Sequence, residues 1–188
     1  MSSETGRGLR ADAVRNRRLA LDAATALLAE RGRPLTVEAI ATRAGLGAGT
    51  VVRAFGGKGA LLDAAVSSLL EPVVQRGRDV LAQDDALAAL RAFLVDLMVF
   101  QAAHDRVNDH LAGLDLPDTM RLRTELVAVV RELIVRAQAD GSVRSDIAPD
   151  LATTLIGETA YATARAGAGV PGLAEAYLAV LLDGLRPR

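Results

Sequence analysis

The sequence contains no cysteine and no tryptophan, and only 3% of its residues are aromatic. Without cysteine the chain can form neither disulfides nor thiolate metal sites. With so few aromatic side chains, the core must consist mainly of leucine, valine and alanine. Alanine and leucine favour helices, and strand-forming residues are comparatively few, so we expect an all-α fold. A hydrophobic fraction of 51% over 188 residues excludes a wholly disordered chain.

Long apolar runs are also missing. The first ten residues, MSSETGRGLR, lack the apolar segment of a signal peptide. No uninterrupted run of about 18 apolar residues is present, so we expect no membrane-spanning helix. Together these features favour a cytoplasmic protein.

Lysine is almost absent, because Lys58 is the only one in the chain. Charge is unevenly distributed along the sequence. Residues 1–60 hold ten basic and five acidic residues, a net charge of +5, whereas residues 61–188 hold twelve and eighteen, a net charge of −6. A basic first third followed by an acidic remainder indicates a module that faces a polyanion, joined to a domain of another kind.

The basic region has the pattern of a helix-turn-helix. Residues 1–9 are expected to be a disordered tail, and a helix is expected from about Arg10 to Arg31. Thr36 suits the N-cap of a short helix at 37–43, and a turn containing Gly45 leads to a second short helix at about 47–54. Two short helices joined by such a turn are typical of DNA-binding proteins. The expected small core consists of Val37, Ile40, Ala41, Leu46 and Val51.

The glycine-rich stretch AGLGAGTVVRAFGGKGALL (44–62) covers the second of these short helices and the residues around it. Small residues at the start of a helix let it lie deep in the major groove, so that Thr50 and Arg53 reach bases or phosphates. Lys58 begins the next helix and is expected to meet a phosphate. Arg15, Arg17 and Arg18 are either solvated or near the phosphate backbone. The residues predicted to bind DNA are Thr36, Gly47, Ala48, Thr50, Val51, Arg53 and Lys58.

Residues 21–62 resemble the N-terminal domain of the TetR family of transcriptional repressors. The matching segments are DAATALLAERG at 22–32, TVEAIATRAGLGAGTV at 36–51 and the pattern F-x-x-K-x-x-L-L at 55–62. The resemblance implies a homodimer with about nine helices per subunit, a helix-turn-helix domain at 10–56, and a domain at 57–188 for ligand binding and dimerisation. Three positions depart from the family pattern: Val52 replaces a usual tyrosine, Ala54 a frequent polar residue, and Gly59 a common glutamate.

Five further helices are expected after an amphipathic helix at 61–70 that Pro72 kinks or ends. They are placed at 86–103, 105–112, 117–140, 149–168 and from Pro171 onward. The helix at 86–103 is apolar on more than one stripe, which indicates burial on several sides. Apolar residues with a few polar groups nearby suit an effector site. The candidate residues are Phe93, Leu97, Phe100, Gln101, His104, Asn108, His110, Met120, Arg123, Glu158 and Tyr161.

The last two helices carry a broad apolar stripe that one neighbouring helix does not cover. We expect them to form a four-helix bundle with the same helices of a second subunit. The predicted interface residues are Leu155, Tyr177, Leu178, Leu181 and Leu185.

The leading hypothesis is a ligand-responsive transcriptional regulator, a repressor released from a palindromic operator by a small, mostly apolar ligand, with no cofactor. A zinc site is disfavoured because His104 and His110 lie about 240° apart around a helix. An α-helical enzyme is disfavoured because the sequence has no nucleophile elbow, P-loop or HExxH motif. A helical protein-interaction adaptor remains an alternative, although it needs neither a helix-turn-helix nor a basic first third.

Overall fold

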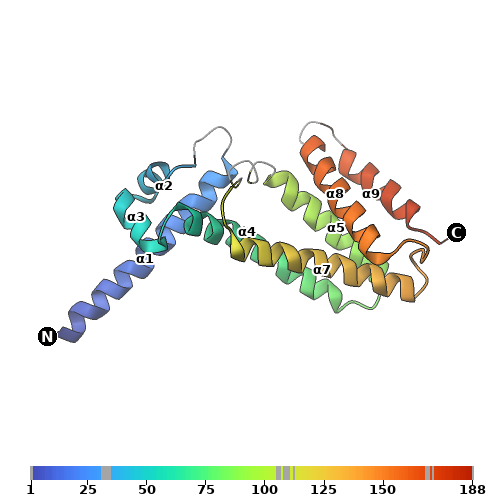
Figure 1. Cartoon of the computed structure of the whole chain (residues 1–188), viewed down its shortest axis with the longest axis horizontal. Helices are drawn as coiled ribbons and strands as arrows, with labels where there is room; N and C mark the ends of the chain where they lie inside the picture. Colours follow the sequence, from blue (N-terminus) through green and yellow to red (C-terminus); the bar gives the residue numbers. More distant parts are fainter. Residues whose placement is uncertain are drawn as a thin grey trace. The chain divides into compact units, whose positions relative to one another are not determined.

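The computed structural model describes residues 2–30, 35–104, 107, 111, 113–167, 170 and 172–187. Within this part of the chain every regular element is a helix, which confirms the all-α prediction (Figure 1). The described helices are α1 to α5 and α7 to α9. The helix expected at 105–112 falls largely outside the described residues. The chain divides into unit 1, Met1–Leu69 with Arg106–Met120, and unit 2, Leu70–Asp105 with Arg121–Arg188.

The helix α1 spans Ser2–Ala29, so it starts well before the expected Arg10. Residues 2–9, expected as a tail, are part of this helix in the structure. Extending a helix that already exists needs no new nucleation, so even a polar segment can lengthen it.

The helices α2 (Val37–Ala44) and α3 (Ala48–Phe55) form the expected helix-turn-helix. The hydroxyl of Thr36 accepts a hydrogen bond from the Ala39 amide at 3.1 Å and caps α2. Gly45 ends α2 in the left-handed conformation, at φ 65°, which a residue with a Cβ rarely adopts. Ile40, Ala41 and Val51 are buried, which confirms most of the predicted small core, while Val37 and Leu46 are half-buried.

Arg17 connects α1 to the end of α3. Its Nη1 donates a hydrogen bond to the carbonyl oxygen of Ala54 at 2.6 Å, and its guanidinium carbon lies 4.1 Å from the centroid of the Phe55 ring. A cation at the C-terminus of a helix satisfies an unpaired carbonyl and opposes the helix dipole. Arg17 therefore stabilises the position of α3, a role that the sequence analysis did not assign to it.

Replacing Arg17 by alanine should lower the free energy of unfolding by roughly 1–2 kcal/mol, because an exposed cation–π contact and a charged hydrogen bond are both lost. Arg18→Ala is the matched control. Arg18 is exposed, and within the described residues its only ion pair is the long, exposed one between its Nε and Asp22 Oδ2 at 3.9 Å. Urea unfolding at equal protein concentration measures both changes. Equal midpoints for the two variants would contradict the assigned role of Arg17.

The helix α4 spans Lys58–Leu81 and continues through Pro72, so of the two expectations, that Pro72 kinks or ends this helix, the second is excluded. Pro72 lacks an amide proton, which frees the carbonyl of Ser68, but Pro72 is exposed and solvent reaches this side of the helix. Leu61, Leu62 and Ala65 are buried, so the first part of α4 belongs to unit 1. Unit 1 is thus larger than the domain expected at 10–56.

The core of unit 2 is built around α5 (Ala86–Ala103), which has the predicted bounds. The helices α7 (Pro117–Ala139), α8 (Pro149–Gly167) and α9 (Leu173–Gly184) contribute to the same core. By length and composition alone, α5 among the described helices would be able to cross a membrane. However, Phe93, Leu94 and Met98 of α5 are buried in this core, and α5 packs against α8 and α9 (Figure 1). We therefore interpret α5 as a core helix.

Gly77 marks a close approach of α4 to α5 and α7 within unit 2. A Cβ placed on Gly77 would lie 3.0 Å from Cζ of Phe93 and 3.1 Å from Cγ2 of Val129. Both neighbours are buried, so neither can move without disturbing the core.

Gly77→Ala should therefore destabilise the protein by roughly 1 kcal/mol, because overpacking costs more than the gain in helix propensity. Gly59→Ala on the same helix is the matched control, since a Cβ there meets nothing within 4 Å. This change should be neutral or stabilising by up to about 1 kcal/mol. Thermal unfolding in the absence of DNA measures the change in stability of each variant. Stabilisation by Gly77→Ala would contradict the close packing.

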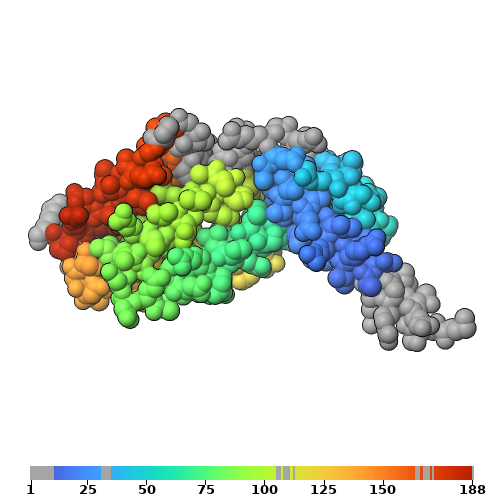
Figure 2. Space-filling model, turned by 180° about the vertical axis from the view of Figure 1, so that it is seen from behind, coloured from blue at the N-terminus to red at the C-terminus, as the bar shows by residue number. Residues whose placement is uncertain are grey.

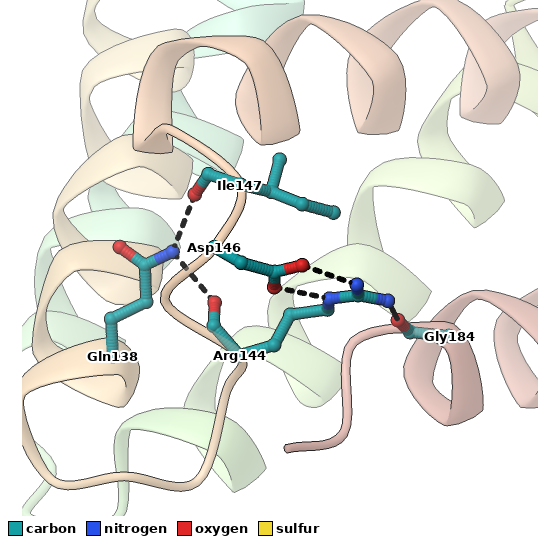
Figure 3. Close-up of polar contacts among 5 residues, drawn as sticks. All are labelled: Gln138, Arg144, Asp146, Ile147 and Gly184. Atoms are coloured by element: carbon teal, nitrogen blue, oxygen red, sulfur yellow. Dashed lines mark hydrogen bonds and ion pairs between the residues drawn. The ribbon is translucent and has the colours of Figure 1, made fainter. Parts of the chain in front are cut away.

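A polar cluster connects the α7–α8 loop to the end of α9 (Figure 3). Arg144 forms a bidentate ion pair with Asp146 and donates a hydrogen bond to the carbonyl of Gly184 at 3.3 Å. Asp146 raises the pKa of Arg144. The amide of Gln138 donates to the carbonyls of Arg144 at 2.9 Å and Ile147 at 2.8 Å. This cluster fastens the C-terminal end of α9 to the α7–α8 loop.

Candidate DNA-binding and effector sites

The outer face of α3 carries the predicted base-reading residues. Gly47 is the N-cap of α3 in extended conformation, and Ala48 is its first residue. Arg53 Nη2 donates a hydrogen bond to the hydroxyl of Thr50 at 3.4 Å, so these two side chains lie side by side on one face. Arg53 and Gly49 are exposed, while Thr50 is half-buried. The face therefore presents a guanidinium and a hydroxyl beside small residues.

Two of the residues predicted to bind DNA also have structural roles. Val51 is 1% exposed, so its side chain packs in the helix-turn-helix core and positions α3. The hydroxyl of Thr36 accepts the hydrogen bond that caps α2 and keeps its own proton as a donor. Lys58 is the first residue of α4 and is exposed. Only Gly56 and Gly57 separate it from the end of α3.

Val52 is 42% exposed on the same helix as Arg53. A tyrosine at this position would add one hydrogen bond to a phosphate, worth on the order of 1 kcal/mol. Arg53 lies one residue further along the exposed face and supplies up to five donors.

The candidate effector residues on α5 fall into two groups. Phe93 is 0% exposed and packs in the core, with Leu97 partly buried against the same cluster. Near the end of α5, the rings of Phe100 and His104 stack with centroids 4.5 Å apart, and His104 Nδ1 lies 2.8 Å from the carbonyl oxygen of Phe100. The structure therefore places Phe93 as a core residue and brings Phe100 and His104 together.

Gln101 is the candidate with an unmet hydrogen-bonding need. Its Oε1 is buried, and no partner for it is found among the described residues. A buried acceptor without a partner is costly and is a recognised mark of a ligand or water position. Gln101 lies beside Phe100 in the sequence and is half-buried.

The remaining described candidates lie on α7 and α8. Met120 belongs to unit 1, whereas Arg123, Glu158 and Tyr161 belong to unit 2. Met120, Arg123 and Glu158 are exposed, and Tyr161 is half-buried. Asn108 and His110 lie outside the described residues.

The residues predicted for the dimer interface differ in how much side-chain surface they expose in the single subunit. Leu178 is 7% exposed and Leu185 is 6% exposed, so both pack inside their own subunit and have little surface to offer a partner. Leu181 and Tyr177 are half-buried against the same core. The Tyr177 hydroxyl and the Thr159 hydroxyl are 2.7 Å apart, and burial raises the pKa of Tyr177.

The outward faces of α8 and α9 both expose large apolar side chains. Leu151 is 54% exposed and Leu155 is 51% exposed on α8, and Val180 is 74% exposed on α9. Atoms of α9, drawn in red, are visible at the surface in Figure 2. Leu155 was among the residues predicted from the sequence for the dimer interface, and Val180 was not. Because α9 is apolar on nearly all sides, its sequence pattern does not distinguish the inner face from the outer one.

Both parts of the chain match known family models. Residues 20–65 match the model described as bacterial regulatory proteins, tetR family. Residues 85–187 match the C-terminal domain of SbtR-like transcriptional regulators. The two matches therefore cover the helix-turn-helix and most of unit 2.

Individual proteins match over nearly the whole length. The HTH-type transcriptional repressor KstR2 of Rhodococcus jostii (strain RHA1) is 31% identical over 180 residues, which is 88% of each chain. A TetR transcription regulatory protein from Mycobacterium vanbaalenii is 35% identical, with a TM-score of 0.62 over 95% of this chain and 99% of that one. KstR2 of Mycobacterium tuberculosis, 23% identical with a TM-score of 0.67 over 92% and 95% of the two chains, shows the same fold. The chain therefore belongs to the TetR family of ligand-responsive transcriptional repressors, which bind DNA as dimers.

Proposed function

We propose that this protein represses transcription by binding a near-palindromic operator as a homodimer, and that a small, mostly apolar effector bound in unit 2 releases it. The observation that carries the proposal is the exposed face of α3, where Thr50 and Arg53 lie together beside small residues on a helix held by Arg17 and Gly45. A cytoplasmic location follows from a DNA partner, and no catalytic role is assigned.

The proposed contacts on DNA divide into two kinds. Arg53 and Thr50 reach base edges in the major groove and give sequence preference. Lys58, at the start of α4, neutralises a phosphate and gives affinity without sequence preference. The α3 helices of the two subunits would lie about 34–36 Å apart, one turn of DNA.

The proposed effector site lies near the end of α5. Phe100 and His104 offer aromatic surface, and Leu97 offers aliphatic surface. The buried Oε1 of Gln101 would accept a hydrogen bond, so the effector should carry at least one hydroxyl or N–H donor on an apolar body.

Release of the operator tests this proposal. The operator is first selected by the wild-type protein from a random-sequence duplex library, and three probes are then titrated. Stearoyl-CoA and resorcinol are bound in structures of Bacillus subtilis FadR and of RolR, and a ketosteroid represents the class named for KstR2 of M. tuberculosis. We expect a larger apolar probe to release the operator and resorcinol to have little effect. Release by resorcinol alone would contradict an effector that is mainly apolar.

The variant Gln101→Leu should weaken binding of the operator-releasing probe by about tenfold, since one buried hydrogen bond to the ligand is lost. Binding of the operator without probe should not change, because Gln101 lies in unit 2. By linkage, operator DNA should weaken binding of the probe by the same factor by which the probe weakens operator binding. Unchanged probe affinity in the variant would remove Gln101 from the proposed site.

A further inference from the structure

The N-terminus of α7 is capped by a side chain from another helix. The Met120 amide donates to the carbonyl of Leu116 at 2.9 Å, so Leu116 stands at the N-cap position, and its aliphatic side chain cannot accept a hydrogen bond. Instead, Asp63 of α4 accepts from the amides of Asp118 at 3.1 Å and Thr119 at 2.8 Å. It also accepts from the Thr119 hydroxyl at 2.7 Å. These amides are the ones that an N-cap aspartate normally binds.

This interhelical cap, formed by Asp63 with Asp118 and Thr119, is shielded from water. Asp63 is 5% exposed and Thr119 is 1% exposed. Loss of the carboxylate would leave buried donors without partners, and water cannot easily replace it. The negative charge also lies at the positive end of the α7 dipole. The geometry therefore strongly favours one relative position of α4 and the first turn of α7.

The two helices joined by the cap have different roles along the chain. The helix α4 begins at Lys58, directly after the base-reading helix α3, and Asp63 lies in its second turn. The helix α7 continues from Thr119 to Leu133 and Ile134, which are buried in the core that contains Phe93 of α5. A rearrangement that shifts the second turn of α4 relative to the first turn of α7 would therefore break the cap.

We propose that the interhelical cap stabilises the DNA-binding conformation, so that Asp63 is a positioning residue that couples operator binding to the state of α7. The inference rests on the proposed function and adds to it a named coupling contact. Because coupling is reciprocal, operator binding must in turn stabilise the cap by the same factor.

Variants of Asp63 test the first half of this coupling. Asp63→Ala removes all three hydrogen bonds, and Asp63→Asn keeps one acceptor oxygen. Operator affinity should fall about tenfold for the alanine variant and about threefold for the asparagine variant, while affinity for a random duplex stays within about twofold. Glu71→Ala, an exposed carboxylate on the same helix, is the matched control and should change neither. Equal losses on operator and random duplex would show a merely structural role and overturn the proposal.

Amide exchange in the wild-type protein tests the second half and needs no variant. Exchange of the Asp118 and Thr119 amides should slow by about tenfold when the selected operator is added, and less with a random duplex. Unchanged exchange would overturn the proposed coupling even if operator binding is tight. If the wild-type protein selects no duplex at all, the proposed function itself fails, and the coupling with it.

Discussion

Replacing Leu155 and Val180 by aspartate should convert the dimer into monomers and weaken operator binding by about 100-fold or more. Both side chains are large, apolar and exposed in the single subunit, at 51% and 74%. In a two-fold interface they would be buried, where an unpaired carboxylate costs several kcal/mol. A monomer contacts one half-site only and loses the effective concentration that links the two, which is worth roughly 10²–10⁴ in affinity. Sedimentation and operator titration measure the two losses.

The control for the dimer variant is Val127→Asp on α7. Val127 is 56% exposed in the same unit, so the change introduces one of the two added carboxylates at a comparable degree of exposure. It should leave both dimerisation and operator binding unchanged. Substitution of Leu178 would be a poor test, because its burial in the subunit core means that aspartate there would unfold the protein. A wild-type protein that sediments as a monomer at micromolar concentration, or a double variant that still dimerises, would refute the interface.

Replacing Arg53 by alanine should weaken operator binding by roughly 1–3 kcal/mol, or about 5- to 160-fold, with little effect on a random duplex. Arg53 lies on the exposed face of α3 beside Thr50, where a guanidinium can reach a base edge. Lys58→Ala should instead weaken operator and random duplex about equally. Fluorescence anisotropy with both duplexes separates base reading from phosphate binding.

Salt dependence provides the second measurement for the same pair. Binding by the wild-type protein should weaken steeply between low and physiological salt, because phosphate contacts release counterions. Lys58→Ala should reduce the slope of log affinity against log salt by about one. Binding that is indifferent to salt would contradict the proposed DNA interface, and an unchanged slope would remove Lys58 from it.

The local elements of this protein were predictable because local chemistry specifies them. Thr36 and Gly45 mark the ends of α2 through a side-chain cap and a left-handed glycine, and both did so as expected. The bounds of α5 followed from a continuous helix-favouring, apolar segment without glycine or proline. Pro72 does not end α4, because a proline on an exposed helix face can be accommodated, and exposure is a tertiary property.

The sequence by itself therefore determined the helical class, the helix-turn-helix and the residue types at its DNA-facing end. The tertiary structure decided which side of each apolar helix is internal: Leu178 faces the core and Val180 faces solvent, although both are apolar residues of α9. The cap that Asp63 provides for α7 also depends on the tertiary structure. Asp63 and Thr119 are 56 residues apart, and no sequence periodicity predicts that they meet. Short-range signals fix helices and turns, whereas inner and outer faces and interhelical caps depend on how the whole chain buries its apolar surface.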